Sequence, residues 1–275
     1  MRSIYFFILM VLSFSCNSVN KDSKINVEDN FKGIENTNLN LLSFNILNEF
    51  PHDSTSFTEG LFMHAGLLYE STGSPEELPN TKSLFGIVNL KTGQIQRAKE
   101  IDKKKYFGEG ITILNGKLYQ LTYKNKTGFI YDAKSFRLLS SFKYKNEEGW
   151  GLTNDSINLI MSDGTNKITF LNPKNFKVVK ELYVSDNNNK VENVNELEYV
   201  KGFIYANIYT TNIIIKIDCL TGKVIQKIDL TYLYQKALNK NPNSLEMNGI
   251  AYNSNTNKFY LTGKMWPYIF EGNFY

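Results

Sequence analysis

The chain has little of the side-chain chemistry on which many enzymes depend. Its 275 residues include only two cysteines, Cys16 and Cys219, and only two histidines. Because Cys16 lies at the end of an N-terminal apolar stretch, we expect no disulfide in the folded part, whose stability must come from packing. So few histidines and cysteines argue against a tightly bound transition metal. We therefore expect a protein that needs neither a metal nor a cofactor.

Two further absences reduce the number of functions that the chain could have. The chain contains neither a phosphate-binding P-loop nor a G-x-G-x-x-G fingerprint. Its formal net charge is only +4, and its one dense basic run is Lys103-Lys104-Lys105. Nucleic-acid-binding proteins usually carry a broader basic stripe, so we interpret this run as a solvated loop and expect no nucleic-acid partner.

The first 40 residues have the features of an export signal followed by a tether. Arg2 precedes an apolar stretch, residues 4–14, that is too short to span a bilayer as a mature helix. Cys16 resembles the lipid-modified cysteine of bacterial lipoproteins, although Ser13 replaces the usual leucine; the alternative is an ordinary signal peptide with an incidental cysteine. Residues 17–40 are polar and charged, as a flexible tether would be.

These features predict three segments. We expect residues 1–16 to be a lipoprotein-type signal peptide with Cys16 as the lipid attachment site, and residues 17–40 to be the tether. Residues 41–275 would form the folded catalytic domain. The protein would then be exported and anchored to a membrane of the bacterial cell envelope through its N-terminal lipid alone.

One short passage occurs five times after residue 50: polar or aromatic residues, then Gly or Glu, an apolar strand, a turn and a second strand. The copies are marked by five residues spaced 41 to 53 positions apart: Gly60, Gly110, Gly151, Glu196 and Gly249. A repeat of this length built only of strands is typical of a propeller blade, which needs neighbours to bury both its faces. The sequence therefore predicts an all-β fold, a five-bladed β-propeller.

Turn signals divide each repeat into two inner strands. The turns are predicted at residues 64–66, 115–116, 154–155, 201–202 and 253–257, and the strands after them at 67–70, 117–120, 157–161, 203–206 and 258–261. The fifth repeat ends before it can form a complete outer pair. Residues 41–50 alternate in the manner of a strand and would supply the missing outer strand, tying the ends together. The single helix that we expect covers residues 230–238.

The ring geometry brings chemistry-bearing residues together. The first residue of an inner strand and the last residue of its hairpin partner lie at the same end, so all five blades contribute to one face near the axis. The side chains expected there are Phe57, Glu59, Glu70, Glu109, Tyr123, Trp150, Asn195, Glu196, Tyr209, Asn248, Lys264 and Trp266. Carboxylates, amides, an ammonium and rings at a narrow mouth predict a pocket for a small molecule or a chain terminus.

Several of these residues also have a purely structural interpretation. Glu70 and Glu196 could cap backbone amides between blades, and the two tryptophans could fill interfaces between blades. Lys264 could be a solvated loop residue, and the glycines beside Glu109 could serve conformation alone. Residues 52–54, His-Asp-Ser, contain the residue types of a hydrolytic triad, but such side chains must converge in space, and consecutive residues do not.

The passages resemble those of the plant and bacterial type of glutaminyl-peptide cyclotransferase, also called glutamine cyclotransferase. The matching stretches occur in the expected order over roughly residues 45–272: 50–53, 57–61, 69–73, 107–110, 149–152, 161–164, 195–198, 205–207, 248–251 and 262–267. The resemblance implies a five-bladed propeller that needs no metal for catalysis. It also implies an enzyme that cyclises an N-terminal glutamine of a peptide or protein to pyroglutamate and releases ammonia.

The resemblance also implies roles for particular residues. The glutamate of the F-G-E-G passage, here Glu109, would accept a proton from the attacking α-amine and return it to the departing nitrogen. Burial among rings would raise its pKa toward neutrality. Lys264 and Asn195 would hold the polar groups of the substrate or the developing oxyanion, and Trp150 would pack on its apolar surface. Glu109 and Lys264 are thus the expected catalytic residues, and the other pocket residues would bind substrate.

The chain departs from the family pattern at three of these positions. Tyr123 and Tyr209 stand where the family commonly has tryptophan, and Glu59 stands where glutamine is usual. Tyrosine keeps a flat ring with less apolar surface, so a weaker or shifted substrate preference is expected. Glu59 would raise the pKa of Glu109 further if the two carboxyls approach closely.

Two other functions stay open at this stage. One is a surface-anchored propeller that binds a peptide or a sugar without catalysis, and the other is a lactonase-type hydrolase, which would require a divalent cation. A titrating acid together with a lysine favours the cyclotransferase, since a binder would need only the rings. Because a closed propeller needs no partner to cover its edges, we expect a monomer.

Overall fold

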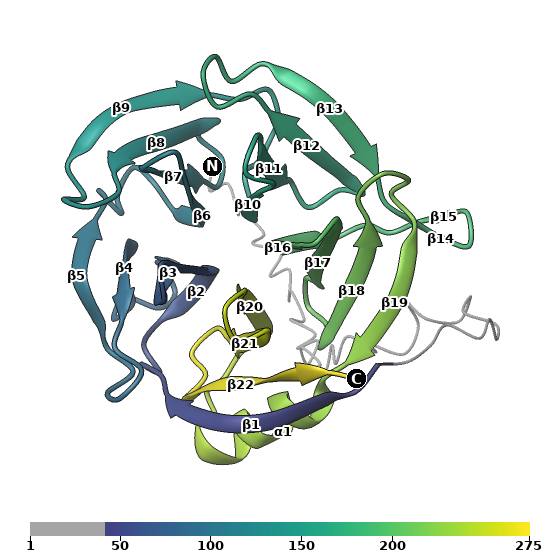
Figure 1. The fold of residues 1–275 in the computed structure, drawn as a ribbon. Helices are drawn as coiled ribbons and strands as arrows, with labels where there is room; N and C mark the ends of the chain where they lie inside the picture. Colours follow the sequence, from purple (N-terminus) through teal and green to yellow (C-terminus); the bar gives the residue numbers. More distant parts are fainter. Residues whose placement is uncertain (1–41) are drawn as a thin grey trace, which may run out of the picture. The chain divides into compact units, whose positions relative to one another are not determined.

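The computed structural model describes residues 42–275, so the predicted signal peptide, the tether and Cys16 lie outside the described residues. Residues 44–274 contain five four-stranded antiparallel sheets that surround a central axis (Figure 1). The predicted five-bladed β-propeller is confirmed. No helix within residues 42–275 is both long enough and apolar enough to cross a bilayer.

Four blades use strands that are consecutive in the sequence and run from the axis outward. They are β2 (Phe57–His64), β3 (Leu67–Gly73), β4 (Leu84–Val88) and β5 (Ile95–Glu100); β6 (Gly108–Leu114), β7 (Lys117–Thr122), β8 (Thr127–Asp132) and β9 (Leu138–Lys143); β10 (Leu152–Asn154), β11 (Leu159–Ser162), β12 (Lys167–Leu171) and β13 (Val178–Tyr183); and β16 (Val194–Val200), β17 (Phe203–Ile208), β18 (Ile213–Asp218) and β19 (Val224–Asp229). A small hairpin that the sequence did not predict, β14 (Ser185–Asp186) with β15 (Asn189–Lys190), precedes the fourth blade.

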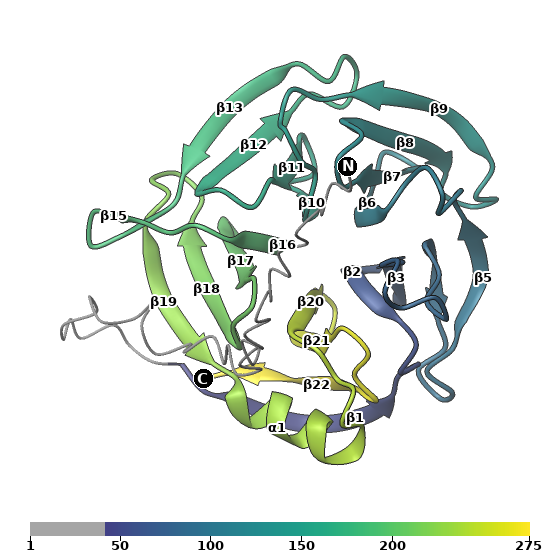
Figure 2. The same cartoon turned by 180° about the vertical axis from the view of Figure 1, so that it is seen from behind.

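The fifth blade joins the two ends of the described chain. Its strands are β20 (Met247–Asn253), β21 (Lys258–Gly263), β22 (Tyr268–Phe274) and, on the outside, β1 (Phe44–Pro51). β1 runs antiparallel to β22, from Phe44 opposite Phe274 to Pro51 opposite Tyr268, and both strands lie at the rim in Figure 2. The predicted closing strand is therefore confirmed, and it covers an edge that would otherwise be open.

The one predicted helix is also present. α1 (Thr231–Lys240) follows the fourth blade and buries Leu233 and Ala237. Its Lys236 forms an ion pair with Glu49 of β1, so the helix packs against the closing strand.

Three of the predicted turns have the geometry that their residues favour. Both central residues have positive φ angles in Ala65-Gly66, Asn115-Gly116 and Lys201-Gly202, as a type I′ hairpin turn requires.

The turn predicted at residues 154–155 is wrong in its length. The Asp155 carboxylate accepts hydrogen bonds from the backbone N–H groups of Ile157 and Asn158, at 2.9 and 2.6 Å, which extends the reversal to four residues. The strand predicted from Ile157 therefore begins only at Leu159, and Ile157 is 71% exposed. A side chain that bonds its own backbone thus replaced the expected tight turn.

The glycines that mark the repeat allow neighbouring blades to meet near the axis. The Gly110 N–H donates to the Trp150 carbonyl oxygen at 2.8 Å. A Cβ atom on Gly110 would lie 2.3 Å from the Leu152 nitrogen, and one on Gly151 would lie 2.3 Å from the Asn195 carbonyl oxygen. These are backbone atoms that cannot rotate away, so the inner strands need glycine here for close approach.

Gly110→Ala is expected to destabilise the protein by about 3 kcal/mol, the upper end of overpacking costs, because the new methyl group meets fixed backbone. The matched control is Gly116→Ala in the adjoining turn, where no atom lies within 4 Å of the new Cβ and only the positive φ is unfavourable, at a cost of roughly 1 kcal/mol. Urea unfolding measures both. Equal losses would show that blade contact at Gly110 is not tight.

Candidate active site

All five blades contribute side chains to one cavity of about 260 Å³. Its lining residues precede or begin inner strands, or follow their hairpin partners, so the cavity lies at one end of the propeller axis. We call it the axial pocket. It is lined by Phe57, Glu59, Pro75, Phe107, Glu109, Tyr123, Trp150, Asn195, Tyr209 and Lys264.

Most of the predicted site residues meet in this pocket. Both expected catalytic residues, Glu109 and Lys264, line it, as do six of the expected substrate-binding residues: Phe57, Glu59, Tyr123, Trp150, Asn195 and Tyr209. Pro75 and Phe107 were not predicted. Phe107 lies two positions before Glu109 in the F-G-E-G passage, and the period of two along a strand could have indicated it.

Irregular pairing at the start of the inner strands directs these side chains. The register shifts between Thr58 and Gly60, between Gly108 and Ile111, and between Val194 and Leu197. Glu59, Glu109 and Asn195 lie inside these three irregular segments. Such bulges interrupt the alternation of side chains and turn one of them toward a site.

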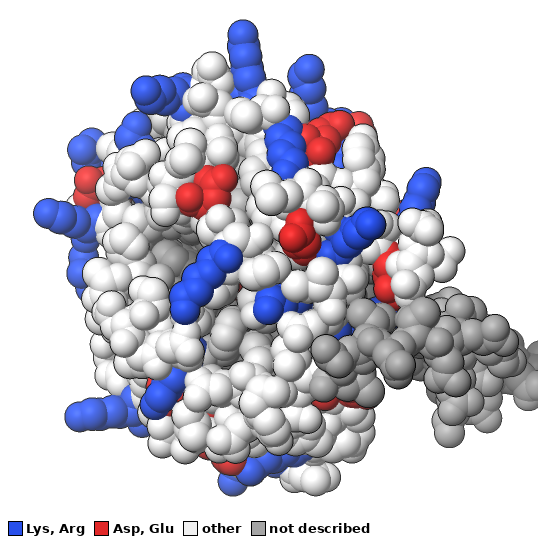
Figure 3. Space-filling view, turned by 45° about the vertical axis from the view of Figure 1, so that its right-hand side comes forward, with Lys and Arg blue, Asp and Glu red and all other residues white. Residues whose placement is uncertain are grey.

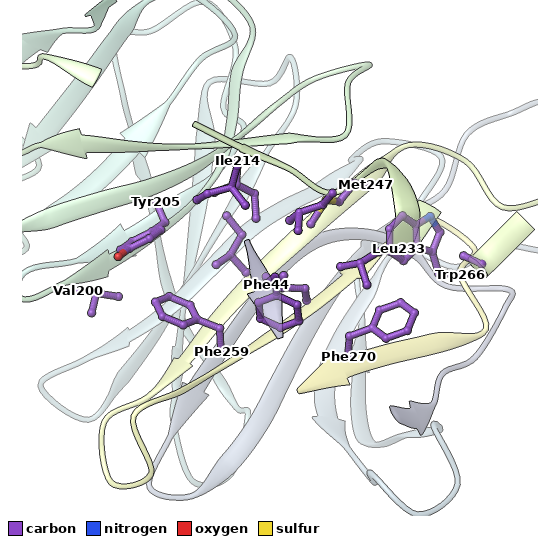
Figure 4. Packing of buried hydrophobic residues seen from close by; sticks show 14 residues of the cluster. Phe44, Val200, Tyr205, Ile214, Leu233, Met247, Phe259, Trp266 and Phe270 are labelled. Carbon is purple, nitrogen blue, oxygen red and sulfur yellow. The ribbon is translucent and has the colours of Figure 1, made fainter. Parts of the chain in front are cut away.

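Glu196 and Trp266 were predicted to bind substrate, but neither lines the pocket. The Glu196 carboxylate accepts hydrogen bonds from the backbone N–H groups of Leu61, at 3.1 Å, and Ile250, at 2.9 Å, and so caps amides between blades. Trp266 is fully buried with Leu233 and Phe270 in an apolar cluster (Figure 4). For both residues the structural interpretation replaces the functional one.

Glu70 and Asn248, also predicted to bind substrate, lie behind the pocket wall instead. The Asn248 Nδ2 donates to the Thr58 carbonyl oxygen at 2.9 Å and to Glu59 Oε2 at 3.1 Å, so it supports Glu59. Glu70 accepts a hydrogen bond from the Thr58 hydroxyl at 2.8 Å and lies 3.0 Å from His52. Neither residue lines the cavity. The strand that was expected to end at Glu70 continues to Gly73, so Glu70 lies within β3 and not at its exit.

Lys264 is held between two carboxylates. Its Nζ lies 2.9 Å from Glu59 Oε1 and 3.4 Å from Glu246 Oε1, and its side chain is only 4% exposed. The same Nζ lies 4.4 Å from the ring centroid of Phe57 and 5.2 Å from that of Tyr209. Burial alone would lower the pKa of Lys264, but the two carboxylates raise it above its ordinary value. The lysine is a fixed cation and not a solvated loop residue.

Glu246 was missed by sequence reasoning. It lies just before β20, two positions ahead of Asn248, in the segment where the other repeats place their polar residues. Phe57 lies at the same distance before its own glycine marker, so alignment of the repeats could have indicated Glu246.

Two carboxyls of the axial pocket hold protons unusually strongly. Burial raises the pKa of Glu109 well above its ordinary value, and the nearby Glu59 carboxylate raises it further, while Lys264 opposes both effects. Burial raises the pKa of Glu59 to about 7 despite the adjacent Lys264. A carboxyl that exchanges its proton near neutral pH is suited to act as both base and acid.

Aromatic rings form the remaining wall. The Trp150 and Tyr209 rings meet edge to face with centroids 5.3 Å apart, and Phe107 lies 6.0 Å from Tyr123 and 6.1 Å from Phe57. The Trp150 Nε1 donates to Glu148 at 2.8 Å, which fixes the indole ring. The pocket thus combines an apolar wall with a buried acid and a buried cation.

A second cavity, of about 490 Å³, is lined by residues that include Asp155, Lys180 and Asp218, but none of the predicted site residues lines it. Figure 3 shows lysine and arginine side chains scattered over the visible face with acidic residues between them. Among residues 42–275, no three His, Cys, Asp or Glu side chains are grouped so that they could hold a metal ion.

Fold and pocket together define a class: a five-bladed propeller enzyme with an acid and a lysine enclosed at the axis. Residues 10–274 match the family described as glutamine cyclotransferase, and the chain belongs to that family. The predicted resemblance is confirmed.

Two relatives agree with this result. The glutaminyl-peptide cyclotransferase of Arabidopsis thaliana is 34% identical over 229 residues, which cover 82% of this chain and 69% of that protein. The crystal structure of Myxococcus xanthus glutaminyl cyclase is 31% identical, with a TM-score of 0.77, and the match covers 85% of this chain and 97% of that one.

Proposed function

We propose that this protein is a glutaminyl-peptide cyclotransferase that uses Glu109 to transfer the proton of the reaction. The carrying observation is that Glu109, a buried carboxyl with a raised pKa, shares the axial pocket with the fixed cation Lys264. The substrate would be a peptide or protein that begins with glutamine.

The reaction makes one bond and breaks one. The α-amine attacks the side-chain amide carbon of the same glutamine, Glu109 accepts the proton that the amine loses, and a tetrahedral intermediate forms. Glu109 then donates that proton to the amide nitrogen, which leaves as ammonia. Lys264 and Asn195 would stabilise the oxyanion of the intermediate, since charge that develops in a buried site is strongly affected by fixed charges and donors.

The size of the pocket favours a chain end. A cavity of about 260 Å³ can enclose one side chain with its terminal amine, and the rings beside it would pack on the aliphatic part. An internal glutamine has no free amine to attack and would not react.

The test is incubation of residues 41–275 with a dipeptide that begins with glutamine. Release of ammonia, together with the matching loss of mass from the peptide, is the expected result, and an N-acetylated peptide should not react. Saturable binding without turnover would support the non-catalytic binder. Chelator-sensitive hydrolysis of lactones would support the lactonase.

We also propose that the protein is a lipoprotein of the bacterial cell envelope, anchored through Cys16, and that it acts as a monomer without a metal. The basic, apolar and small residues at positions 2–16 support the anchor. Labelling with a fatty acid tests it: the wild-type protein should carry the label and Cys16→Ser should not.

Glu59→Gln is expected to move one limb of the pH profile of kcat/KM to lower pH. The negative charge of Glu59 raises the pKa of Glu109. Removing that charge lowers this pKa, so Glu109 becomes available as a base at lower pH. The substrate amine must also be deprotonated to attack, but its pKa in solution is the same for both enzymes, so a shift of the limb belongs to the enzyme.

The matched control is Glu77→Gln, which removes an equal charge from an exposed loop. Its profile should coincide with that of the wild type. If the pH profile of Glu59→Gln does not move, the charge of Glu59 does not affect the pKa of Glu109.

A further inference from the structure

A buried histidine–glutamate pair lies between the fifth and first blades. His52 directly follows β1, and its Nε2 lies 3.0 Å from Oε1 of Glu70 in β3. Both side chains are completely inaccessible to solvent. The mechanism above does not use either residue, so their burial needs another explanation.

The partners of the imidazole determine where its protons lie. The His52 Nδ1 is 2.8 Å from the Trp266 carbonyl oxygen, which can only accept, so Nδ1 must carry a hydrogen. Nδ1 is also 3.2 Å from the Thr262 hydroxyl oxygen, whose own hydrogen is donated to the Tyr268 carbonyl oxygen. Both neighbours of Nδ1 therefore accept.

The proton between the two side chains belongs on the imidazole. The Glu70 Oε1 also accepts a hydrogen bond from the Thr58 hydroxyl. The charged groups that act on His52 are Glu70 and Asp53, both acidic, and they raise the pKa of His52 against the effect of burial. Because histidine ordinarily binds a proton more tightly than glutamate does, His52 is an imidazolium that donates from both nitrogens.

One end of this pair is attached to the segment that bears Lys264. Trp266, which accepts from His52, lies two residues after Lys264, and the His52 backbone N–H donates to the Pro267 carbonyl oxygen at 3.1 Å. Between them Met265 has a φ of +59°, a left-handed conformation that a residue with a side chain adopts only when its surroundings hold it. The Met265 N–H donates to the Ser56 carbonyl oxygen at 2.7 Å, and His52 bonds the two residues that follow Met265.

The other end is attached to the segment that bears Glu59. Glu70 bonds the hydroxyl of Thr58, the residue before Glu59, and the Thr58 carbonyl oxygen accepts from Asn248. The pair thus connects the backbone after Lys264 with the side chain of the residue before Glu59, and Lys264 and Glu59 join the same two blades inside the pocket.

We propose that His52, held as an imidazolium by Glu70, is a positioning residue that braces the Gly263–Pro267 segment and so places Lys264 for the stabilisation of the oxyanion. This inference rests on the proposed function for its kinetic consequence alone. The protonation state and the hydrogen bonds of His52 stand independently of any activity.

Nitrogen NMR of the imidazoles tests the protonation state. The chain has only two histidines, so His64→Gln leaves a single imidazole with its two nitrogen signals, and His64 is exposed on the far end of β2. We expect both ring nitrogens of His52 to stay protonated at pH values where an ordinary histidine is neutral. An ordinary histidine has a pKa of about 6.5. A neutral ring, or one whose Nδ1 lacks a proton, overturns the proposal.

Two variants with amide side chains distinguish the hydrogen bond between His52 and the Trp266 carbonyl oxygen, which we call the brace, from the pairing of His52 with Glu70. The glutamine amide of His52→Gln takes the place of Nε2, so it keeps the bond to Glu70 and loses the bond to Trp266; kcat should fall roughly tenfold. The asparagine amide of the double variant His52→Asn, Glu70→Gln takes the place of Nδ1, so it keeps the brace without a buried lone charge; kcat should stay within about twofold of wild type. An unchanged kcat in both variants would show that the pair only stabilises the fold, and the reverse order would show that the bond to Trp266 is not what matters; either result overturns the proposal.

A double-mutant cycle completes the test. In a Lys264→Met background, His52→Gln should have almost no further effect on kcat/KM, because the group that it positions is gone. An equal loss in both backgrounds overturns the proposal. If the wild-type protein releases no ammonia, the proposed function fails, while the NMR result still decides the protonation state of His52. If the wild-type protein does release ammonia, His64→Gln should leave kcat unchanged.

Discussion

Replacing Glu109 with glutamine is expected to lower kcat by roughly 10² to 10⁴, the range attributed to general acid–base catalysis. Glutamine keeps the shape of the side chain but cannot accept and return a proton. The fold should persist, because burial already favours an uncharged group at this position. Ammonia release and thermal unfolding, measured on the same preparation, check both parts.

Glu198→Gln is the matched control. Glu198 is another buried carboxyl, with a pKa raised to about 8 by burial, but it accepts a hydrogen bond from the Tyr252 backbone at 2.9 Å and does not line the pocket. Its substitution should leave kcat unchanged. A Glu109→Gln variant with near-normal turnover would transfer the role to Glu59, the other carboxyl with a raised pKa that lines the axial pocket.

Lys264→Met is expected to lower kcat/KM by roughly 10² to 10³, comparable to the loss of an oxyanion-stabilising group. It should also destabilise the protein by up to about 3–5 kcal/mol, because Glu59 and Glu246 lose their buried cation. Lys264 lowers the pKa of Glu59 in the folded protein. In Lys264→Met the folded-state pKa of Glu59 therefore lies even further above the pKa that Glu59 has in the unfolded chain. The destabilisation should therefore be smaller at acid pH, where the carboxyls are protonated, and grow as pH rises through this pKa.

Lys258→Met controls for the loss of a lysine from the same hairpin. Lys258 begins β21, is partly exposed and pairs with Glu271 at 3.5 Å, far from the pocket. Its removal should leave kcat unchanged and cost less than about 1 kcal/mol. Urea midpoints at two pH values distinguish the variants; a pH-independent loss in Lys264→Met would mean that its carboxylates are not its partners.

The fold was predictable because its causes are local or periodic. A turn such as Asn115-Gly116 favours the positive φ angles that it adopts here, and the spacing of the repeat counts the blades. The closing strand β1 followed from an alternating segment and an incomplete last blade. The reversal at residues 155–158 was missed because the Asp155 side chain, and not the backbone preference, decides its length.

The site was predictable in its position but not in all its members. Asn195 and Glu196 are adjacent, yet one lines the pocket and the other caps amides of two other blades. Simple alternation would place such neighbours on opposite faces without saying which faces the pocket, and the irregular pairing between Val194 and Leu197 disturbs even that order.

The sequence by itself determined the repeat, its turns, the closed ring of five blades and the glutamine cyclotransferase family, since each depends on residues close together in the chain or on their order. Only the tertiary structure decided that Lys264 lies between Glu59 and Glu246, and that His52 joins Glu70 to the Trp266 backbone. Contacts between the first and last blades arise when the ring closes, and the direction of each side chain there depends on bulges and burial that no local pattern records.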